Sequence, residues 1–236
     1  MPIDGLLLDL DDTLLDERSA TRTALLAFLA AHLSSWEGES EAEALQRWRL
    51  ISATHWFRYE NGEISFHEQR RARIRDFLAL PLSAIEADIA FESYLTAYES
   101  SWSMVPECLA FLGKTAEIPK VIITNGDKAQ QLNKIQMTGL REHVVGVVTP
   151  EDCGYWKPHP ETFHAALALL RLKPEQCLMI GDDWVRDIQP AMQLGIRCFQ
   201  VELGNPDKSL LSAIATGELS SELPSVNAIC SLEIRQ

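Results

Sequence analysis

The sequence has no long hydrophobic run, and this absence excludes a membrane-spanning protein. Its longest apolar stretch, Ala24–Ala31, is far shorter than the roughly 20 residues that a helix needs to cross a bilayer. The N-terminal residues Met1–Asp4 do not join a basic stretch to an apolar one, as secretory signals do. We therefore expect a soluble, cytoplasmic protein with no membrane partner.

Cysteines are few, which excludes a disulfide framework and a zinc site. No two of the five form a CxxC pair, and no spacing of cysteine and histidine matches a zinc-binding pattern. Free thiols in a reducing cytosol are the simplest interpretation. The cysteines are Cys108, Cys153, Cys177, Cys198 and Cys230.

Basic residues are also scarce, with 21 lysines and arginines against 34 acidic residues and a net charge of -13. Such a surface repels a nucleic-acid polymer unless a local basic patch overrides the net charge. The densest basic cluster lies between Arg70 and Arg75, close to Glu68 and Asp76. Helical spacing would spread these arginines around the helix, so we interpret them as a solvated face and expect no nucleic-acid partner.

The chain does have the composition and patterning of a globular α/β protein. Hydrophobic residues fill 46% of its 236 positions, enough for one large domain or for a core and a smaller domain. Apolar runs bounded by turn residues predict buried strands near residues 6–10, 121–124, 144–148, 178–180 and 198–201. Helices are predicted between them, one ending at Met137 and others at 160–170 and 185–194. Strands that alternate with helices indicate a parallel sheet.

Residues from about 19 to 101 follow a different pattern. Apolar residues recur there at helical spacing, no strand signal occurs, and Asn61-Gly62 and Pro81 interrupt the segment. We predict a core formed by residues 1–14 and 102–236, with a helical cap inserted at 15–101. The cap follows the first strand, at the edge where open α/β sheets bind ligands. Its two connections to the core would let it act as a lid.

Four polar clusters follow predicted strands: Asp9–Thr13, Thr124–Gly126, Lys157–Pro158 and Gly181–Asp187. Parallel strands bring their carboxyl ends to one edge, so the clusters should converge on one crevice. The aspartates among them would crowd negative charge that a hard divalent cation neutralises, and Mg²⁺ suits carboxylate ligands. Lys157 and Thr124 would add the positive charge and the hydroxyl that a phosphoryl group requires.

In this order, the four clusters resemble the motifs of the haloacid dehalogenase-like (HAD) hydrolase superfamily. The DxDxT signature is Asp9–Thr13, the Thr motif is Thr124, the Lys motif is Lys157, and the acidic GDDxxxD motif is Gly181–Asp187. The resemblance extends from residue 5 to about 202. It implies an α/β fold with a Rossmann-like parallel-sheet core and an inserted α-helical cap of subfamily I.

The resemblance implies that Asp9 is the nucleophile, which forms an aspartyl-phosphate, and that Asp11 is the general acid and base. Alternate residues of an extended segment point the same way, so the side chains of Asp9 and Asp11 could both lie close to one phosphoryl group. The phosphoryl oxygens would be held by Thr124, the Asn125 amide and Lys157.

The metal in this family is Mg²⁺. The resemblance implies that Asp9, the backbone carbonyl of Asp11 and Asp182 hold it. Asp187 would orient the water shell of the metal or Lys157. The neighbouring Asp12 and Asp183 have no role in this scheme, and we interpret them as structural.

The expected activity is Mg²⁺-dependent hydrolysis of a small phosphorylated metabolite, a nucleotide or a sugar phosphate. The stretch Trp56–Ile64 resembles the cap of pyrimidine nucleotidases and related small-molecule phosphatases, and its aromatics could stack on a base or pack between helices. Three alternatives remain: a haloacid dehalogenase, whose first motif lacks the second aspartate; a phosphomutase; and a non-catalytic binding protein. The sequence predicts neither the oligomeric state nor the structure of the tail Ser225–Gln236.

Overall fold

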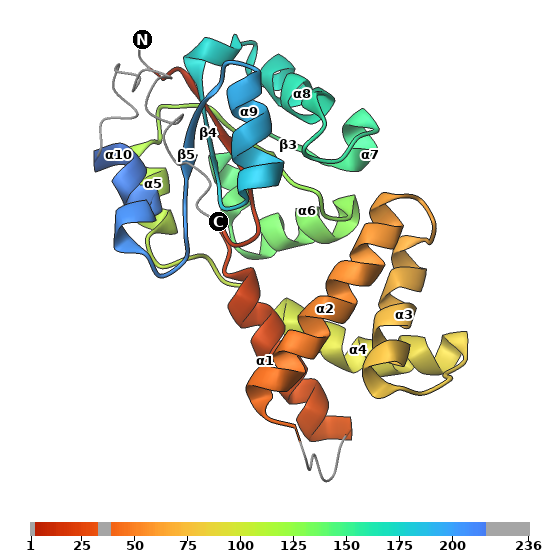
Figure 1. Ribbon diagram of the computed structural model, residues 1–236. Helices are drawn as coiled ribbons and strands as arrows, with labels where there is room; N and C mark the ends of the chain where they lie inside the picture. The colour runs from red at the N-terminus through yellow and green to blue at the C-terminus, as the bar shows by residue number, and fades with distance from the viewer. Residues whose placement is uncertain (1–2, 33–38, 216–236) are drawn as a thin grey trace, which may run out of the picture. The chain divides into compact units, whose positions relative to one another are not determined.

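The structure is a computed structural model that describes residues 3–32 and 39–215. The chain divides into two compact units. We call residues 1–14, 104–128 and 139–236 the core unit, and residues 15–103 and 129–138 the helical unit. Figure 1 shows both, coloured along the chain. Cys230 and the tail from Ser225 lie outside the described residues.

The core unit is built on a five-stranded parallel sheet in the order β3-β2-β1-β4-β5. Its strands are β1 (Gly5–Leu8), β2 (Lys120–Ile123), β3 (Gly146–Val148), β4 (Cys177–Gly181) and β5 (Arg197–Gln200). β1 lies in the middle, and all four of its residues are buried. The predicted α/β class and parallel sheet are confirmed. The third strand is shorter than predicted: it begins at Gly146, three residues after a 3₁₀ turn at Leu140–His143.

Helices cover the sheet on both faces (Figure 1). The helices of the core unit are α5 (Cys108–Lys114), α7 (Pro150–Cys153), α8 (Pro160–Leu170), α9 (Gln189–Gln193) and α10 (Leu210–Ala215). Short 3₁₀ turns lie at Pro174–Gln176 and Pro206–Lys208. On one face, apolar residues of α8 and α9 pack against Leu7, Val121 and Met179. α8 begins at Pro160, as predicted, because proline fits the first turn of a helix.

The helix predicted at 185–194 is present, but its first half is π-helical and not α-helical. Residues Trp184–Ile188 form a π-helical turn, and α9 starts only at Gln189. The Gln189 N–H donates to the carbonyl of Trp184, five residues earlier. Pro190 follows and has no N–H to continue the regular ladder. The wider turn therefore places the acidic residues of this segment differently from a regular α-helix.

The helical unit contains α1 (Glu17–His32), α2 (Glu41–Glu60), α3 (Phe66–Leu78), α4 (Ala84–Ser100) and most of α6 (Lys128–Met137). Gly62, with φ of 71°, takes the left-handed conformation in the turn after α2. Among the cap aromatics, Trp56 and Tyr59 pack together and against Phe66, with ring centroids 5.4–6.3 Å apart. Phe57, in contrast, is 62% exposed.

α6 lies in the helical unit although it follows β2 in the sequence. Lys134 on α6 is buried, and its Nζ donates to Oε2 of Glu17 at 3.2 Å. The same Nζ lies 5.1 Å from the ring centroid of Tyr98 and 5.8 Å from that of Trp102. The chain consequently passes between the two units four times, where the sequence suggested two connections.

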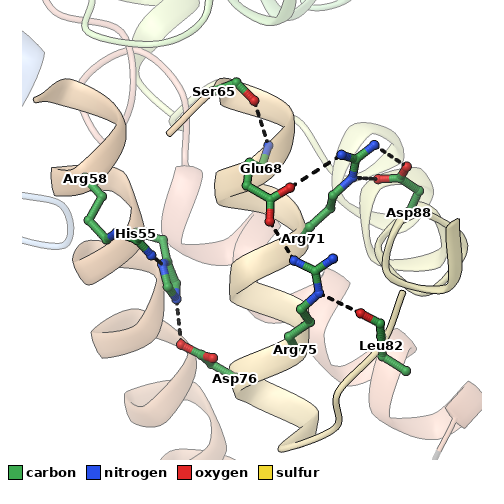
Figure 2. Close-up of polar contacts among 9 residues, drawn as sticks. All are labelled: His55, Arg58, Ser65, Glu68, Arg71, Arg75, Asp76, Leu82 and Asp88. Atoms are coloured by element: carbon green, nitrogen blue, oxygen red, sulfur yellow. Dashed lines mark hydrogen bonds and ion pairs between the residues drawn. The ribbon is translucent and has the colours of Figure 1, made fainter. Parts of the chain in front are cut away.

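The arginines of α3 are engaged in contacts and do not form a free basic patch. Figure 2 shows the contacts of Arg71 and Arg75. Arg71 binds Asp88 of α4 through two nitrogens, at 2.8 and 2.7 Å. Arg75 donates to Glu68 at 2.6 Å and to the Leu82 carbonyl at 2.8 Å. The guanidinium groups of Arg70 and Arg73 lie over the rings of Phe66 and Trp48.

Within residues 3–32 and 39–215, no helix combines the length and the apolar character needed to cross a lipid bilayer.

Candidate active site

The carboxyl edge of the core sheet brings several of the predicted site residues together. Asp9 directly follows β1, and Asp182 directly follows β4. Lys157 comes from the segment between α7 and α8, and Asp187 from the π-helical turn. Parallel strands place these segments at one edge because all their carboxyl ends point the same way.

Lys157 is the centre of this group. Its Nζ donates to Oδ1 of Asp9 and to Oδ1 of Asp187, both at 2.6 Å. All three side chains are buried, with exposed fractions of 4%, 9% and 1%. One ammonium therefore joins two carboxylates from separate segments, Asp9 directly after β1 and Asp187 in the π-helical turn that follows β4.

Burial and crowding determine the charges of this group. Burial raises the pKa of Asp9 to about 8, with smaller contributions from the charges of Asp187 and Asp182, and the positive charge of Lys157 only partly offsets these effects. Burial lowers the pKa of Lys157, but the charges of Asp187 and Asp9 outweigh it and raise this pKa above the usual range. Lys157 is thus charged at neutral pH, while Asp9 lacks enough positive charge around it to ionise readily.

Asp187 reaches this position because residue 181 is a glycine. A Cβ atom built on Gly181 would lie 2.6 Å from Cγ of Asp187, closer than real Cβ atoms approach. The second carboxylate oxygen of Asp187 accepts the N–H of Asp183 at 3.2 Å. Gly181 therefore makes room for Asp187, and Asp187 holds Lys157 in place, as one of its two predicted roles requires.

The carboxylates also fit a divalent cation. Asp9, Asp182 and Asp187 each offer an oxygen, and these oxygens all lie within 4.8 Å of one another. With Lys157, they make three carboxylates and one ammonium, which leaves a net charge of -2 when all four are ionised. An all-oxygen donor set with this charge suits Mg²⁺. Asp187 is a member of this group that the sequence reasoning assigned to a supporting role.

The predicted phosphate-binding residues lie on neighbouring loops. Thr124 follows β2 and is buried, and its Oγ1 accepts the N–H of Gly126 at 3.2 Å. The Asn125 side chain donates to the carbonyl of Lys157 at 2.8 Å and accepts its N–H at 2.7 Å. This side chain positions Lys157 through one of its two amide hydrogens, so its second hydrogen and the main-chain N–H of Asn125 are the donors that can serve the amide role expected from the sequence.

Asp11 lies in the loop after β1 and is partly exposed. Its carboxylate is outside the group formed by Asp9, Asp182 and Asp187. Asp12 adopts a left-handed conformation with φ of 60°, which aspartate tolerates better than most residues. Asp183 accepts the N–H groups of residues 185 and 186 at 2.8 and 3.0 Å. The contacts of Asp183 agree with its interpretation as a structural residue.

Replacing Lys157 by methionine is expected to destabilise the metal-free protein strongly. The change leaves Asp187 buried without its counter-ion and Asp9 without its hydrogen-bond donor, and breaking a buried ion pair in this way costs about 3–5 kcal/mol. The free energy of unfolding in urea, measured in chelator, gives the effect. Lys208→Met is a matched control, because Lys208 pairs with Glu202 at the surface and such pairs contribute about 0–1 kcal/mol. Equal losses in the two variants would contradict the role given to Lys157.

A comparison with known proteins identifies the family. The family model of the haloacid dehalogenase-like hydrolases matches residues 3–195, most of the chain. The chain belongs to the HAD-like hydrolases. The superfamily predicted from the four motifs is thereby confirmed.

Curated relatives of this hydrolase include named phosphatases. The phosphoserine phosphatase of Thermus thermophilus is 27% identical to it, over 84% of this chain and 88% of the relative. The pyrimidine 5'-nucleotidase YjjG of Escherichia coli is 28% identical, over 66% of this chain and 69% of the relative.

The fold also matches solved structures. The HAD-hydrolase YfnB of Bacillus subtilis, in a crystal form bound to magnesium, superposes with a TM-score of 0.72. The match covers 92% of this chain and 99% of YfnB, at 19% sequence identity. The similarity supports the assigned fold.

Proposed function

We propose that this hydrolase is a Mg²⁺-dependent phosphatase of small phosphomonoesters that acts through an aspartyl-phosphate on Asp9. The observation that carries the proposal is the buried group in which Lys157 bridges Asp9 and Asp187, beside the oxygens of Asp182. This group combines a nucleophile with a fixed positive charge and a donor set for a cation. Its named phosphatase relatives support the same chemistry.

In the first step, a carboxylate oxygen of Asp9 attacks phosphorus, and the bond from phosphorus to the alcohol oxygen breaks. Lys157 binds Oδ1 of Asp9, so we assign the attack to Oδ2. Asp11 donates its proton to the departing alcohol. In the second step, Asp11 takes a proton from water, whose oxygen attacks the phosphorus. The bond from Asp9 to phosphorus then breaks, which releases inorganic phosphate and restores Asp9.

The same residues stabilise the charge that develops on the phosphoryl oxygens. We assign hydrogen bonds to the hydroxyl of Thr124 and the main-chain N–H of Asn125, and positive charge to Lys157. Asp9, Asp182 and the main-chain carbonyl of Asp11 would hold Mg²⁺, with Asp187 available from the same carboxylate group. Bound there, the cation supplies Lewis-acid stabilisation of the phosphoryl oxygens and lowers the pKa of Asp9.

The relatives support a small substrate. One is named for phosphoserine and another for pyrimidine 5'-nucleotides, so we propose a phosphorylated metabolite such as a nucleotide or a sugar phosphate. We further propose that the insertion at residues 15–101 acts as a cap that selects among such esters. Phosphate release from a panel of phosphorylated metabolites tests both the activity and the substrate class.

The alternative activities predict different outcomes of that panel. A haloacid dehalogenase attacks carbon and needs no proton donor at the position of Asp11, so the presence of Asp11 favours a phosphatase. A phosphomutase would transfer the phosphoryl group back to a bound sugar and release little inorganic phosphate. A non-catalytic binding protein would release none. Release from at least one ester, lost on chelation, is the result expected for the proposed function.

Replacing Asp11 by asparagine is expected to slow hydrolysis according to the leaving group. General acid–base catalysis contributes about 10²–10⁴ in rate, and esters with poor leaving groups depend on it most. The loss should therefore be large for an alkyl phosphate and much smaller for an aryl phosphate. Steady-state kcat values for both esters give the comparison. Equal losses for the two esters would argue against Asp11 as the acid.

A further inference from the structure

The two loops that carry the proposed phosphate-binding residues are joined at three levels. At the base, the N–H of Thr124 donates to the Val148 carbonyl at 3.0 Å. Next, the side chain of Asn125 exchanges two hydrogen bonds with the backbone of Lys157. At the outer end, Lys128, the first residue of α6, contacts α7. The first two levels involve site residues, whereas the third has no role in the proposed chemistry.

The outer contact is a polar clamp between Lys128, Glu151 and Asp152. The main-chain N–H of Lys128 donates to Oε1 of Glu151 at 3.1 Å, and its Nζ binds Oδ1 of Asp152. The other oxygen of Asp152 accepts the N–H and the hydroxyl of Thr149, at 3.0 and 2.7 Å. Asp152 therefore connects the start of α6 to the start of α7.

Asp152 keeps the negative charge that this clamp requires. Burial alone would raise its pKa, but hydrogen bonds from Lys128 and Thr149 outweigh burial and lower it. The hydrogen bond that Lys128 donates to Asp152 in turn raises the pKa of Lys128. Both groups are charged at neutral pH, and both are partly exposed, with side-chain exposed fractions of 40% for Lys128 and 30% for Asp152.

Polar contacts matter here because α7 has little apolar anchoring. It consists of one turn, Pro150–Cys153, and none of its residues is buried. Only Cys153 packs at the margin of the core cluster. Lys157 follows four residues after α7, so the path of α7 sets where the chain enters the site. A clamp at Asp152 thus restrains the segment that delivers Lys157.

We propose that Lys128 and Asp152 are positioning residues that hold the loops 124–128 and 149–157 at the separation needed to bind one phosphoryl group. This proposal rests on the proposed function, because it concerns how that site binds phosphate. Neither residue touches the reacting atoms. Their effect is to set the geometry of Thr124 and Lys157, and reacting groups are sensitive to shifts of this kind, since about 1 Å of misplacement can cost 10²-fold in rate.

The test measures phosphate binding in Lys128→Met, Asp152→Asn and the double variant. We expect KM for an aryl phosphate and Ki for inorganic phosphate to rise roughly tenfold in each single variant, with a smaller change in kcat. If the two residues act as one clamp, their effects should not add. KM and Ki of the double variant should then be no higher than those of the more strongly affected single variant. Restoring the pair in reversed order, as Lys128→Asp with Asp152→Lys, should recover part of the affinity.

The controls separate this role from a loss of stability. Lys208→Met breaks a surface pair elsewhere in the core unit, and should leave KM and Ki unchanged. A merely structural clamp would lower the melting temperature and the fraction of active enzyme, without raising KM or Ki. If the wild-type protein is active but the variants have unchanged KM and Ki, the clamp is overturned and the proposed function is not. Additive effects in the double variant would overturn the clamp in the same way. A wild-type protein that hydrolyses no phosphate ester would overturn the proposed function, and the clamp with it.

Discussion

The Asp9→Asn variant is expected to hydrolyse no phosphate ester above background and to form no covalent intermediate. The amide is a poor nucleophile, so the variant should lose most of the acceleration of about 10⁶-fold or more that enzymes provide. The amide oxygen can still accept the hydrogen bond from Lys157, which lies 2.6 Å from Oδ1 in the wild type. The variant should therefore keep its fold while losing turnover. Rapid quenching followed by mass spectrometry of the intact chain tests for the phosphoenzyme.

Asp12→Asn is the matched control for this result. It makes the same chemical change in the same loop, and asparagine also tolerates the left-handed conformation of residue 12, with φ of 60°. Activity should persist in Asp12→Asn and disappear in Asp9→Asn. Phosphoenzyme detected in Asp9→Asn would rule out Asp9 as the nucleophile, and loss of activity in Asp12→Asn would contradict the structural role given to Asp12.

Chelation is expected to have the second large effect. Removing divalent cations should lower hydrolysis by about 10³-fold or more, since a metal ion provides several kcal/mol of transition-state stabilisation. Added Mg²⁺ should restore it. Asp182→Asn removes one of the three converging carboxylates, and should raise the Mg²⁺ concentration needed for half-maximal activity. Full activity in thoroughly chelated buffer would exclude the proposed mechanism.

The pH dependence of metal binding provides an independent measurement. The pKa of Asp9 is raised to about 8, so Asp9 is protonated in the metal-free protein at lower pH. A cation binds the ionised form, so Mg²⁺ affinity should rise with pH up to about 8 and then level off. Calorimetry in buffers with different ionisation enthalpies would detect the proton released on binding. Asp9→Asn should abolish that proton release, whereas an affinity independent of pH would contradict this assignment.

Much of the fold could be predicted because its strands are short, apolar and bounded by turn residues. β1 and β4 are buried throughout, which gives a continuous apolar run in the sequence. Asp9 and Asp182 follow these runs directly, so the topology alone predicts that they converge. The same topology predicts Lys157 at this edge, but its bonds to Asp9 and Asp187 could not be predicted, because nothing local in the sequence links Lys157 to a carboxylate 148 residues away.

The remaining features depend on tertiary contacts that have no local signal. The Asn125 side chain bonds to a backbone 32 residues later in the chain, so its positioning role is invisible in the Thr-Asn-Gly sequence. The π-helical turn arises where Asp183 caps one end and Pro190 limits the other. Apolar periodicity cannot distinguish such a turn from a regular helix. The clamp at Lys128 and Asp152 likewise joins residues 24 positions apart.

The four passages between the two units matter for recombination among related hydrolases. Because Lys134 of α6 is buried against Glu17 and Tyr98, the transferable module is discontinuous. It consists of residues 15–103 together with 129–138. A chimera that exchanged only the inserted segment would replace Glu17 and Tyr98 by the residues of another hydrolase. The buried ammonium of Lys134 would then lose its counter-ion. Shuffling by single crossovers on either side of the insertion therefore breaks this module, whereas exchanging both segments keeps it whole.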